Sequence, residues 1–227
     1  MKNARDLALG FVIFSALCCI LALPRVVLLA LPRPVQAAVA LGVVVWFFAW
    51  VGVRRKRDAQ ALDRIAAWVT DGGWTAVPTN RSWPWTSLLR DPGSVVVKRA
   101  WQSIIDDLLI TVGEVEWADN ALDGAVVGWA GKGVFVEIQL PVGTEPMGIR
   151  RPHRTIGASH RLDRPELHDA YENGEIPPFT ARDRFLFTFE AVKRDDRMVP
   201  ELFDRLIERT RRIVRLLDLG PDAESAR

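Results

Sequence analysis

The sequence predicts an integral membrane protein whose transmembrane part carries a cytoplasmic α+β domain. Three observations predict this fold class. Two long apolar runs, 7–24 and 35–53, stand near the start of the chain, and a block of four basic residues, 54–57, follows the second run. The remaining residues, 58–227, are more polar and show the alternating and helical apolar patterns of a globular domain.

The two apolar runs predict a transmembrane helical hairpin over residues 1–57. As a helix, each run approaches the roughly 30 Å thickness of the hydrocarbon core of a bilayer. Neither run contains a charged residue. Lys2 and Arg5 before the first run also fit a cleaved signal peptide, but this run is long for a signal core and a second run follows at once. We therefore expect the uncleaved hairpin.

The basic residues predict the orientation of this hairpin. Lys2 and Arg5 precede the first run and the block 54–57 follows the second, whereas the connection between the runs holds only Arg25 and Arg33. Basic residues remain on the cytoplasmic side of a membrane. The expected location is therefore the cell inner membrane, with two spans and both termini in the cytoplasm.

The distribution of charge excludes a nucleic-acid-binding domain. Residues 1–57 carry eight Lys and Arg against one Asp, and residues 58–227 carry 22 Lys and Arg against 27 Asp and Glu. The basic character therefore belongs to the first part of the chain and not to the domain. Arg outnumbers Lys by 25 to 5, which is typical of a GC-rich bacterial genome. Both cysteines, Cys18 and Cys19, lie in the first run, so no disulfide is expected in the domain.

Between the hairpin and the domain, residues 58–92 predict a helical extension and a linker. Apolar residues recur at helical spacing from 58 to 70, and Gly72 and Gly73 end this pattern. Residues 74–92 are rich in Trp and Pro and predict an irregular connection. We expect the α+β domain to occupy residues 93–220 and a short tail to follow at 221–227.

Within the domain, the apolar patterns predict an antiparallel sheet. Residues 95–110 fit both a strand and a helix, and we favour strands; residues 109–117 alternate as a strand does. Residues 125–129 and 134–140 predict a hairpin around a turn at 131–133. Gly131 and Lys132 do not form a phosphate-binding loop, because Gly133 stands where that motif needs Ser or Thr.

The end of the domain predicts a short helix, a strand and a long helix. Residues 165–171 fit a short helix, and 184–192 alternate, with Phe185, Phe187 and Phe189 on one face. From Val199 to Leu217, apolar residues recur every three or four positions. We expect this last helix to cover the sheet.

A cluster of arginines is the main candidate site. Five arginines stand within 15 residues, against the single acid Asp163. Arginine side chains bind phosphate groups well, so the cluster predicts a surface for anionic groups such as phospholipid headgroups. A solvated loop whose arginines pair with the acids of the domain is the alternative. The five residues are Arg150, Arg151, Arg154, Arg161 and Arg164.

The three histidines of the chain, His153, His160 and His168, lie in the same region. A metal site built on them is an alternative, but their gaps of seven and eight residues match no compact metal motif. No catalytic motif is present: Gly157 and Ser159 resemble half of a nucleophile elbow, in which Arg161 replaces the second glycine. We predict no catalytic residues, no bound metal and no cofactor.

The function expected from the sequence is that of a membrane-tethered cytoplasmic binding or scaffold module, which is not an enzyme. Its expected partners are the lipid bilayer, through anionic headgroups, and a membrane or cytoplasmic protein, but not nucleic acid. The alternative is a phosphate-handling or hydrolytic enzyme that uses the His/Arg segment 150–168. An enzyme would place His153 or His160 beside an acid in a concave pocket, whereas a binding module would present the segment as an open patch.

Overall fold

A computed structural model of the chain describes residues 33–89, 94–193 and 196–221. The chain divides into two compact units, residues 1–57 and residues 58–227. The helix α3 (Arg33–Asp71) belongs in part to each unit. All the other helices and strands in the described residues belong to the second unit.

The predicted transmembrane hairpin is wrong. The second apolar run, 35–53, is not a separate span: it is the first part of α3, which continues without a break through the basic block 54–57 and through Asp58 to Asp71. In the part of the chain that the structure describes, no helix is both long enough and apolar enough to cross a membrane. The first run, 7–24, lies outside the described residues.

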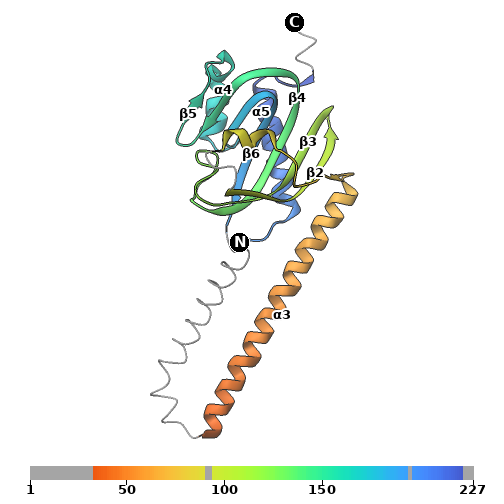
Figure 1. Cartoon of the computed structure of the whole chain (residues 1–227), viewed down its shortest axis with the longest axis vertical. Coiled ribbons are helices and arrows are strands. Elements are labelled where there is room, and N and C mark those ends of the chain that lie inside the picture. Colours follow the sequence, from red (N-terminus) through yellow and green to blue (C-terminus); the bar gives the residue numbers. More distant parts are fainter. Residues whose placement is uncertain (1–32, 90–93, 194–195, 222–227) are drawn as a thin grey trace. The chain divides into compact units, whose positions relative to one another are not determined.

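The fold class is therefore corrected. The prediction of a two-span integral membrane protein is wrong, and the structure supports an α+β chain with an antiparallel sheet. The sheet of residues 58–221 runs in the order β1-β2-β3-β4-β5, and β6 also pairs with β4 (Figure 1). Its strands are β1 (Thr75–Ala76), β2 (Val95–Ile105), β3 (Leu108–Trp117), β4 (Gly131–Arg150), β5 (Arg154–Ile156) and β6 (Phe179–Val192).

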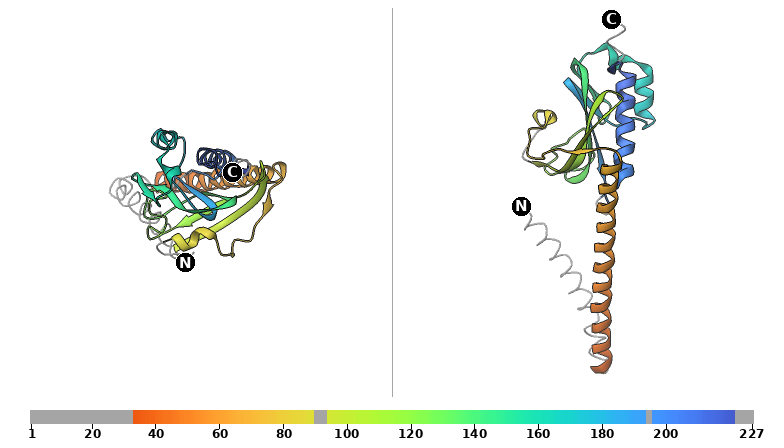
Figure 2. Two further views of the ribbon diagram at one scale, coloured as in Figure 1. Left: turned by 90° about the horizontal axis from the view of Figure 1, so that it is seen from above. Right: turned by 90° about the vertical axis from the view of Figure 1, so that its right-hand side faces the viewer.

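Helices cover one face of the sheet. The first hydrophobic core lies between these helices and that face. Figure 2 shows this arrangement in its right-hand view, where α4 (Pro165–Glu172) and α5 (Pro200–Leu216) lie on the same side of the strands. The helix α5 contributes Phe203, Leu206 and Ile213, each with no exposed surface, and β4 contributes Val134 and Val136 to the same core. The helix predicted at 199–217 thus packs its apolar face against the sheet.

The last turns of α3 join this core. Ile65 is 2% exposed and packs among the core residues, with Trp68 beside it. The indole Nε1 of Trp68 donates a hydrogen bond of 2.8 Å to Asp204 of α5. The helical extension at 58–71 is therefore an integral part of the domain.

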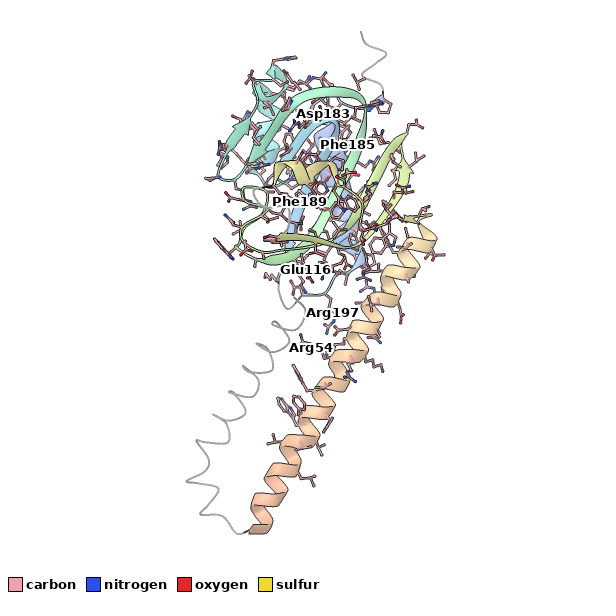
Figure 3. All side chains as sticks on the ribbon, viewed as in Figure 1. Arg54, Glu116, Asp183, Phe185, Phe189 and Arg197 are labelled. Carbon is pink, nitrogen blue, oxygen red and sulfur yellow. The ribbon has the colours of Figure 1, made fainter. Side chains whose placement is uncertain are left out.

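Aromatic side chains from the segment 83–85 cover the opposite face of the sheet and form part of the second core, whereas Trp74 belongs to the first core. A short 3-10 helix, η1 (Pro84–Leu88), lies on the other side of the strands from α5 (Figure 2). Trp83 and Trp85 are 4% and 1% exposed and stack edge-on against Phe135 of β4. Phe189 of β6 contacts Trp85, and Phe187 and Phe185 belong to the same core (Figure 3 labels Phe185 and Phe189). The segment predicted as an irregular linker thus packs on the second face of the sheet.

The predicted hairpin at 125–140 is wrong. Residues 125–129 are not a strand, and β4 begins at Gly131 and pairs with β3. The glycines serve close packing and not a turn: a Cβ on Gly131 would lie 2.6 Å from the Trp117 ring, and one on Gly133 would collide with the carbonyl oxygen of Glu190. The strand also continues past Pro141 to Arg150, with an irregular register from Gln139 to Met147.

Leu206→Ala should destabilise the fold because Leu206 has no exposed surface and lies in the first core. Removing a buried leucine side chain leaves a cavity and costs about 2–5 kcal/mol. Urea unfolding of the full-length chain, followed by circular dichroism, measures this loss.

Arg215→Ala is the matched control on the same helix. Its side chain is 57% exposed and pairs with Glu208, which is equally exposed, so its loss should change the free energy of unfolding by no more than about 0.5 kcal/mol. Equal losses for the two variants would contradict the assigned buried face of α5.

Candidate functional site

The five arginines of the predicted cluster do not form one surface. Arg161 and Arg164 stand at the end of α5. Arg161 donates hydrogen bonds of 3.0 and 3.1 Å to the carbonyl oxygens of Leu217 and Asp218, and Arg164 donates one of 2.6 Å to the carbonyl oxygen of Leu216. The last carbonyls of a helix have no partner within the helix. These two arginines therefore cap α5.

Asp218 belongs to the same cap. Its carboxylate accepts a hydrogen bond of 2.5 Å from Arg164, and this bond lowers the pKa of Asp218 below its usual value. The prediction of an anion-binding surface therefore does not extend to Arg161 and Arg164, whose donors are used inside the protein.

The other three arginines form what we term the arginine hairpin, residues 150–154. Arg150 ends β4 and Arg154 begins β5, and the two are paired directly opposite each other. Arg151 lies in the turn between them. Directly opposed side chains of an antiparallel pair project from the same face of the sheet, so like charges here repel. Burial lowers the pKa of Arg150, while nearby Asp123 raises it and Arg154 lowers it further.

The arginine hairpin differs from the other arginines of residues 58–221 in its lack of partners. In the described part of the chain, Arg150, Arg151 and Arg154 donate no side-chain hydrogen bond and form no ion pair, whereas each of the other described arginines from residue 58 onward has an acidic or carbonyl partner. The residues with partners are Arg64, Arg81, Arg99, Arg161, Arg164, Arg182, Arg184, Arg197, Arg205, Arg209, Arg211, Arg212 and Arg215.

A surface hollow of about 430 Å³ lies beside the arginine hairpin. Arg151 and His153 line it, together with Tyr171 from α4 and Val127 from the loop between β3 and β4. Val127 and Trp129 of this loop are each 68% exposed. Contiguous exposed apolar surface with a polar rim is typical of an interaction site, and these two residues lie in the loop next to Arg151.

The charges on the far side of this hollow are largely neutralised. Glu190 lines the hollow and is paired with both Arg205 and Arg209. Arg209 also donates to the carbonyl oxygens of Gly174 and Glu175. Of the two arginines that line the hollow, Arg151 is therefore the one that forms no ion pair among the described residues, and the exposed acid Glu172 lines the same hollow.

The three histidines do not converge. The ring of His153 packs edge-on against Tyr171, with 5.3 Å between centroids, and His168 forms a hydrogen bond of 2.7 Å with the carbonyl oxygen of Leu162. His160 lines a different hollow, of about 260 Å³, near the end of α5. Among the described residues, no group of three or more His, Cys, Asp or Glu side chains is arranged to hold a metal ion.

A buried ion pair on the second face of the sheet is absent from the sequence prediction. Glu137 of β4 is 5% exposed and accepts a hydrogen bond of 3.1 Å from Arg81, whose guanidinium lies 4.1 Å from the centroid of the Trp83 ring. Burial raises the pKa of Glu137 to about 7, against the opposing effect of Arg81. In the sequence, the signal for this ion pair was Glu137, the single acid within the apolar run 134–140.

Comparisons with known proteins do not assign a family. No family model matches the chain, and no curated protein matches it. A crystal structure of the mycobacterial trehalose monomycolate transport factor A, TtfA, is similar, with a TM-score of 0.46 and 10% sequence identity over 70% of this chain and 95% of that chain. A likeness at this level does not identify a function.

Arg164→Ala should destabilise the protein, because it leaves the carbonyl oxygen of Leu216 and the carboxylate of Asp218 without their donor. The expected cost is about 1–2 kcal/mol. Arg154→Ala removes an exposed arginine without a partner and should change the free energy of unfolding by no more than about 0.5 kcal/mol. Urea titrations of the full-length variants measure both values, and an equal loss would contradict the division of the five arginines.

The free energy of unfolding should fall as the pH rises from 5 to 8, because the folded state holds the Glu137 proton more tightly than the unfolded chain. A raised carboxyl pKa stabilises the fold below the unfolded value of 4.5, and this stability is lost as the pH rises towards about 7. The loss amounts to about 3 kcal/mol at most. Glu137→Gln should remove this part of the pH dependence. Parallel pH profiles of the wild type and the variant would contradict the assignment.

Proposed function

We propose that residues 58–221 form a non-enzymatic binding module that attaches to anionic phospholipid headgroups through the arginine hairpin. One observation carries this proposal. Arg150 and Arg154 are placed opposite each other and Arg151 is next to them. Among the described residues, none of the three donates a side-chain hydrogen bond or forms an ion pair, although Asp123 lies near enough to Arg150 to raise its pKa.

The repulsion within the arginine hairpin favours an anionic ligand. Two like charges in directly opposed positions destabilise a strand pair, and a bound anion removes this cost. The guanidinium group presents its donors in a fork that matches the oxygens of phosphate. A phosphate group is therefore the chemistry that the hairpin fits best.

The exposed apolar residues favour a lipid surface as the source of that phosphate. Val127 lines the same hollow as Arg151, and Trp129 is two residues further along the loop. Trp has a large apolar ring and a polar N–H group, and it prefers the boundary between headgroups and acyl chains. A freely diffusing phosphate would gain nothing from these two residues.

The geometry gives the enzyme alternative no such support. A hydrolytic site needs a base that is oriented by an acid. In the described residues, His153 contacts the ring of Tyr171 and His168 is bonded to a backbone carbonyl. His160 lines the hollow of about 260 Å³ together with Glu145 and Asp218. The hydrogen bonds of the described residues include none between a histidine ring and a carboxylate that would orient a base. The binding of a protein partner, and a location at the inner membrane with both termini in the cytoplasm, stay predictions.

The full-length chain should bind vesicles of phosphatidylcholine and phosphatidylglycerol more tightly than vesicles of phosphatidylcholine alone. The difference should shrink as salt is raised, because the Debye length falls from about 10 Å at 0.1 M to about 3 Å at 1 M. Replacing Arg151 and Arg154 together with Ala should weaken binding to the anionic vesicles by about 1 kcal/mol per arginine, close to thirtyfold in all. Co-sedimentation measures both effects.

Arg64→Ala combined with Arg215→Ala is the matched control, since it removes the same charge from two exposed arginines that have partners. It should leave the preference for anionic vesicles unchanged. Equal weakening by both double variants, or no preference of the wild type for anionic vesicles at low salt, would overturn the proposal. Binding of soluble glycerol phosphate as tightly as vesicles would show that the ligand is a free phosphate and not a lipid surface.

A further inference from the structure

The hollow of about 430 Å³ beside the arginine hairpin carries an acid as well as a base. Besides His153, four charged side chains line it, and two of these, Glu190 and Arg209, are paired with each other. The other two are Arg151 and Glu172. In the described part of the chain, neither of them forms an ion pair or a side-chain hydrogen bond. The hollow therefore presents one positive and one negative charge that the protein does not neutralise.

The backbone holds these two charges at the same hollow. The ring of His153 packs edge-on against that of Tyr171, with 5.3 Å between centroids. His153 lies in the same turn as Arg151, and Tyr171 directly precedes Glu172 in α4. The backbone N–H of Arg151 also donates a hydrogen bond of 2.9 Å to the carbonyl oxygen of Gly124. The contact between the two rings thus fixes the end of α4 against the arginine hairpin.

Glu172 stands where the fold favours a cation. It is the last residue of α4, and the last turn of this helix contains no basic residue. The final carbonyl groups of a helix carry partial negative charge, which repels a carboxylate and attracts a cation. The side chain of Glu172 is exposed, so a ligand in the hollow can reach it. The end of α4 therefore fits a small cationic group, while the arginine hairpin fits an anionic one.

We infer that the lipid bound at the arginine hairpin carries an ammonium group next to its phosphate, as the headgroup of phosphatidylethanolamine does. This inference rests on the proposed function and adds the headgroup that the hollow selects. The phosphate accepts hydrogen bonds from the arginine hairpin, and the ammonium group donates to the carboxylate of Glu172. A short carbon chain joins the two groups, so one headgroup reaches both. Anionic lipids around it still supply the long-range attraction to the surface.

Co-sedimentation of the full-length chain with two sets of vesicles tests the inference. Both sets contain the same fraction of phosphatidylglycerol, and the remaining lipid is phosphatidylcholine in one set and phosphatidylethanolamine in the other. The net charge of the two sets is equal, but the choline nitrogen has no N–H group to donate to a carboxylate. We expect the wild type to bind the ethanolamine set about threefold to fivefold more tightly, as one solvent-accessible ion pair provides.

Two variants of α4 complete the test. Glu172→Gln removes the negative charge from the hollow, so its binding to the two sets should become equal. Glu166→Gln removes the same charge from an exposed residue of the same helix that does not line the hollow, so the gain from ethanolamine should persist. A gain that Glu172→Gln retains, or that Glu166→Gln loses to the same extent, would overturn the inference.

The failure of this inference is distinct from a failure of the proposed function. A wild type that prefers phosphatidylglycerol vesicles to phosphatidylcholine vesicles, but gains nothing from ethanolamine, would overturn this inference alone. A wild type without a preference for phosphatidylglycerol at low salt would overturn the proposed function, and the headgroup selection with it.

Discussion

Burial of both faces of strand β4 is the constraint on which the rest of the domain depends. Val134, Val136 and Ile138 enter the first core and Phe135 enters the second, and none of the four has exposed surface. A strand that is covered on both faces is apolar at successive positions instead of alternating. Each face then needs its own cover, and Glu137, the one acid in this run, needs a cationic partner. Arg81 supplies that cation from the segment that covers the second face.

The two covers differ in kind. The first is helical, because α5 presents an apolar stripe along its whole length, and its end is fixed by Arg161 and Arg164. The second is an irregular segment with little secondary structure, whose Trp83 and Trp85 are buried in the second core. Such a segment relies on specific contacts, which are the pair of Arg81 with Glu137 and the packing of Trp85 on Phe189. A change in either contact therefore acts on the second core before the first.

Patterns with a period could be predicted from the sequence. The alternation at 184–192 and the helical spacing at 199–217 gave β6 and α5, since each pattern reflects one buried face. Other features depend on distant partners: Gly131 packs on Trp117, and Trp85 on β4 and β6. The hairpin prediction for residues 1–57 was wrong because hydropathy alone does not show that the second run continues as one helix to Asp71. Of the five predicted arginines, the sequence could not separate the three without partners from the two that cap α5.

The difference between these two groups of arginines depends on where the fold presents hydrogen-bond acceptors. The end of α5 exposes carbonyl oxygens with partial negative charge, and any nearby arginine gains by donating to them, as Arg161 and Arg164 do. Among the described residues, the end of β4, where Arg150 is paired with Arg154, offers these arginines no comparable set of acceptors. Arginines at this position gain nothing for the fold, and their mutual repulsion destabilises it. Under the proposed function, an anion bound at the arginine hairpin would offset this repulsion. The strength of binding and the cost to the unliganded protein therefore have the same physical origin.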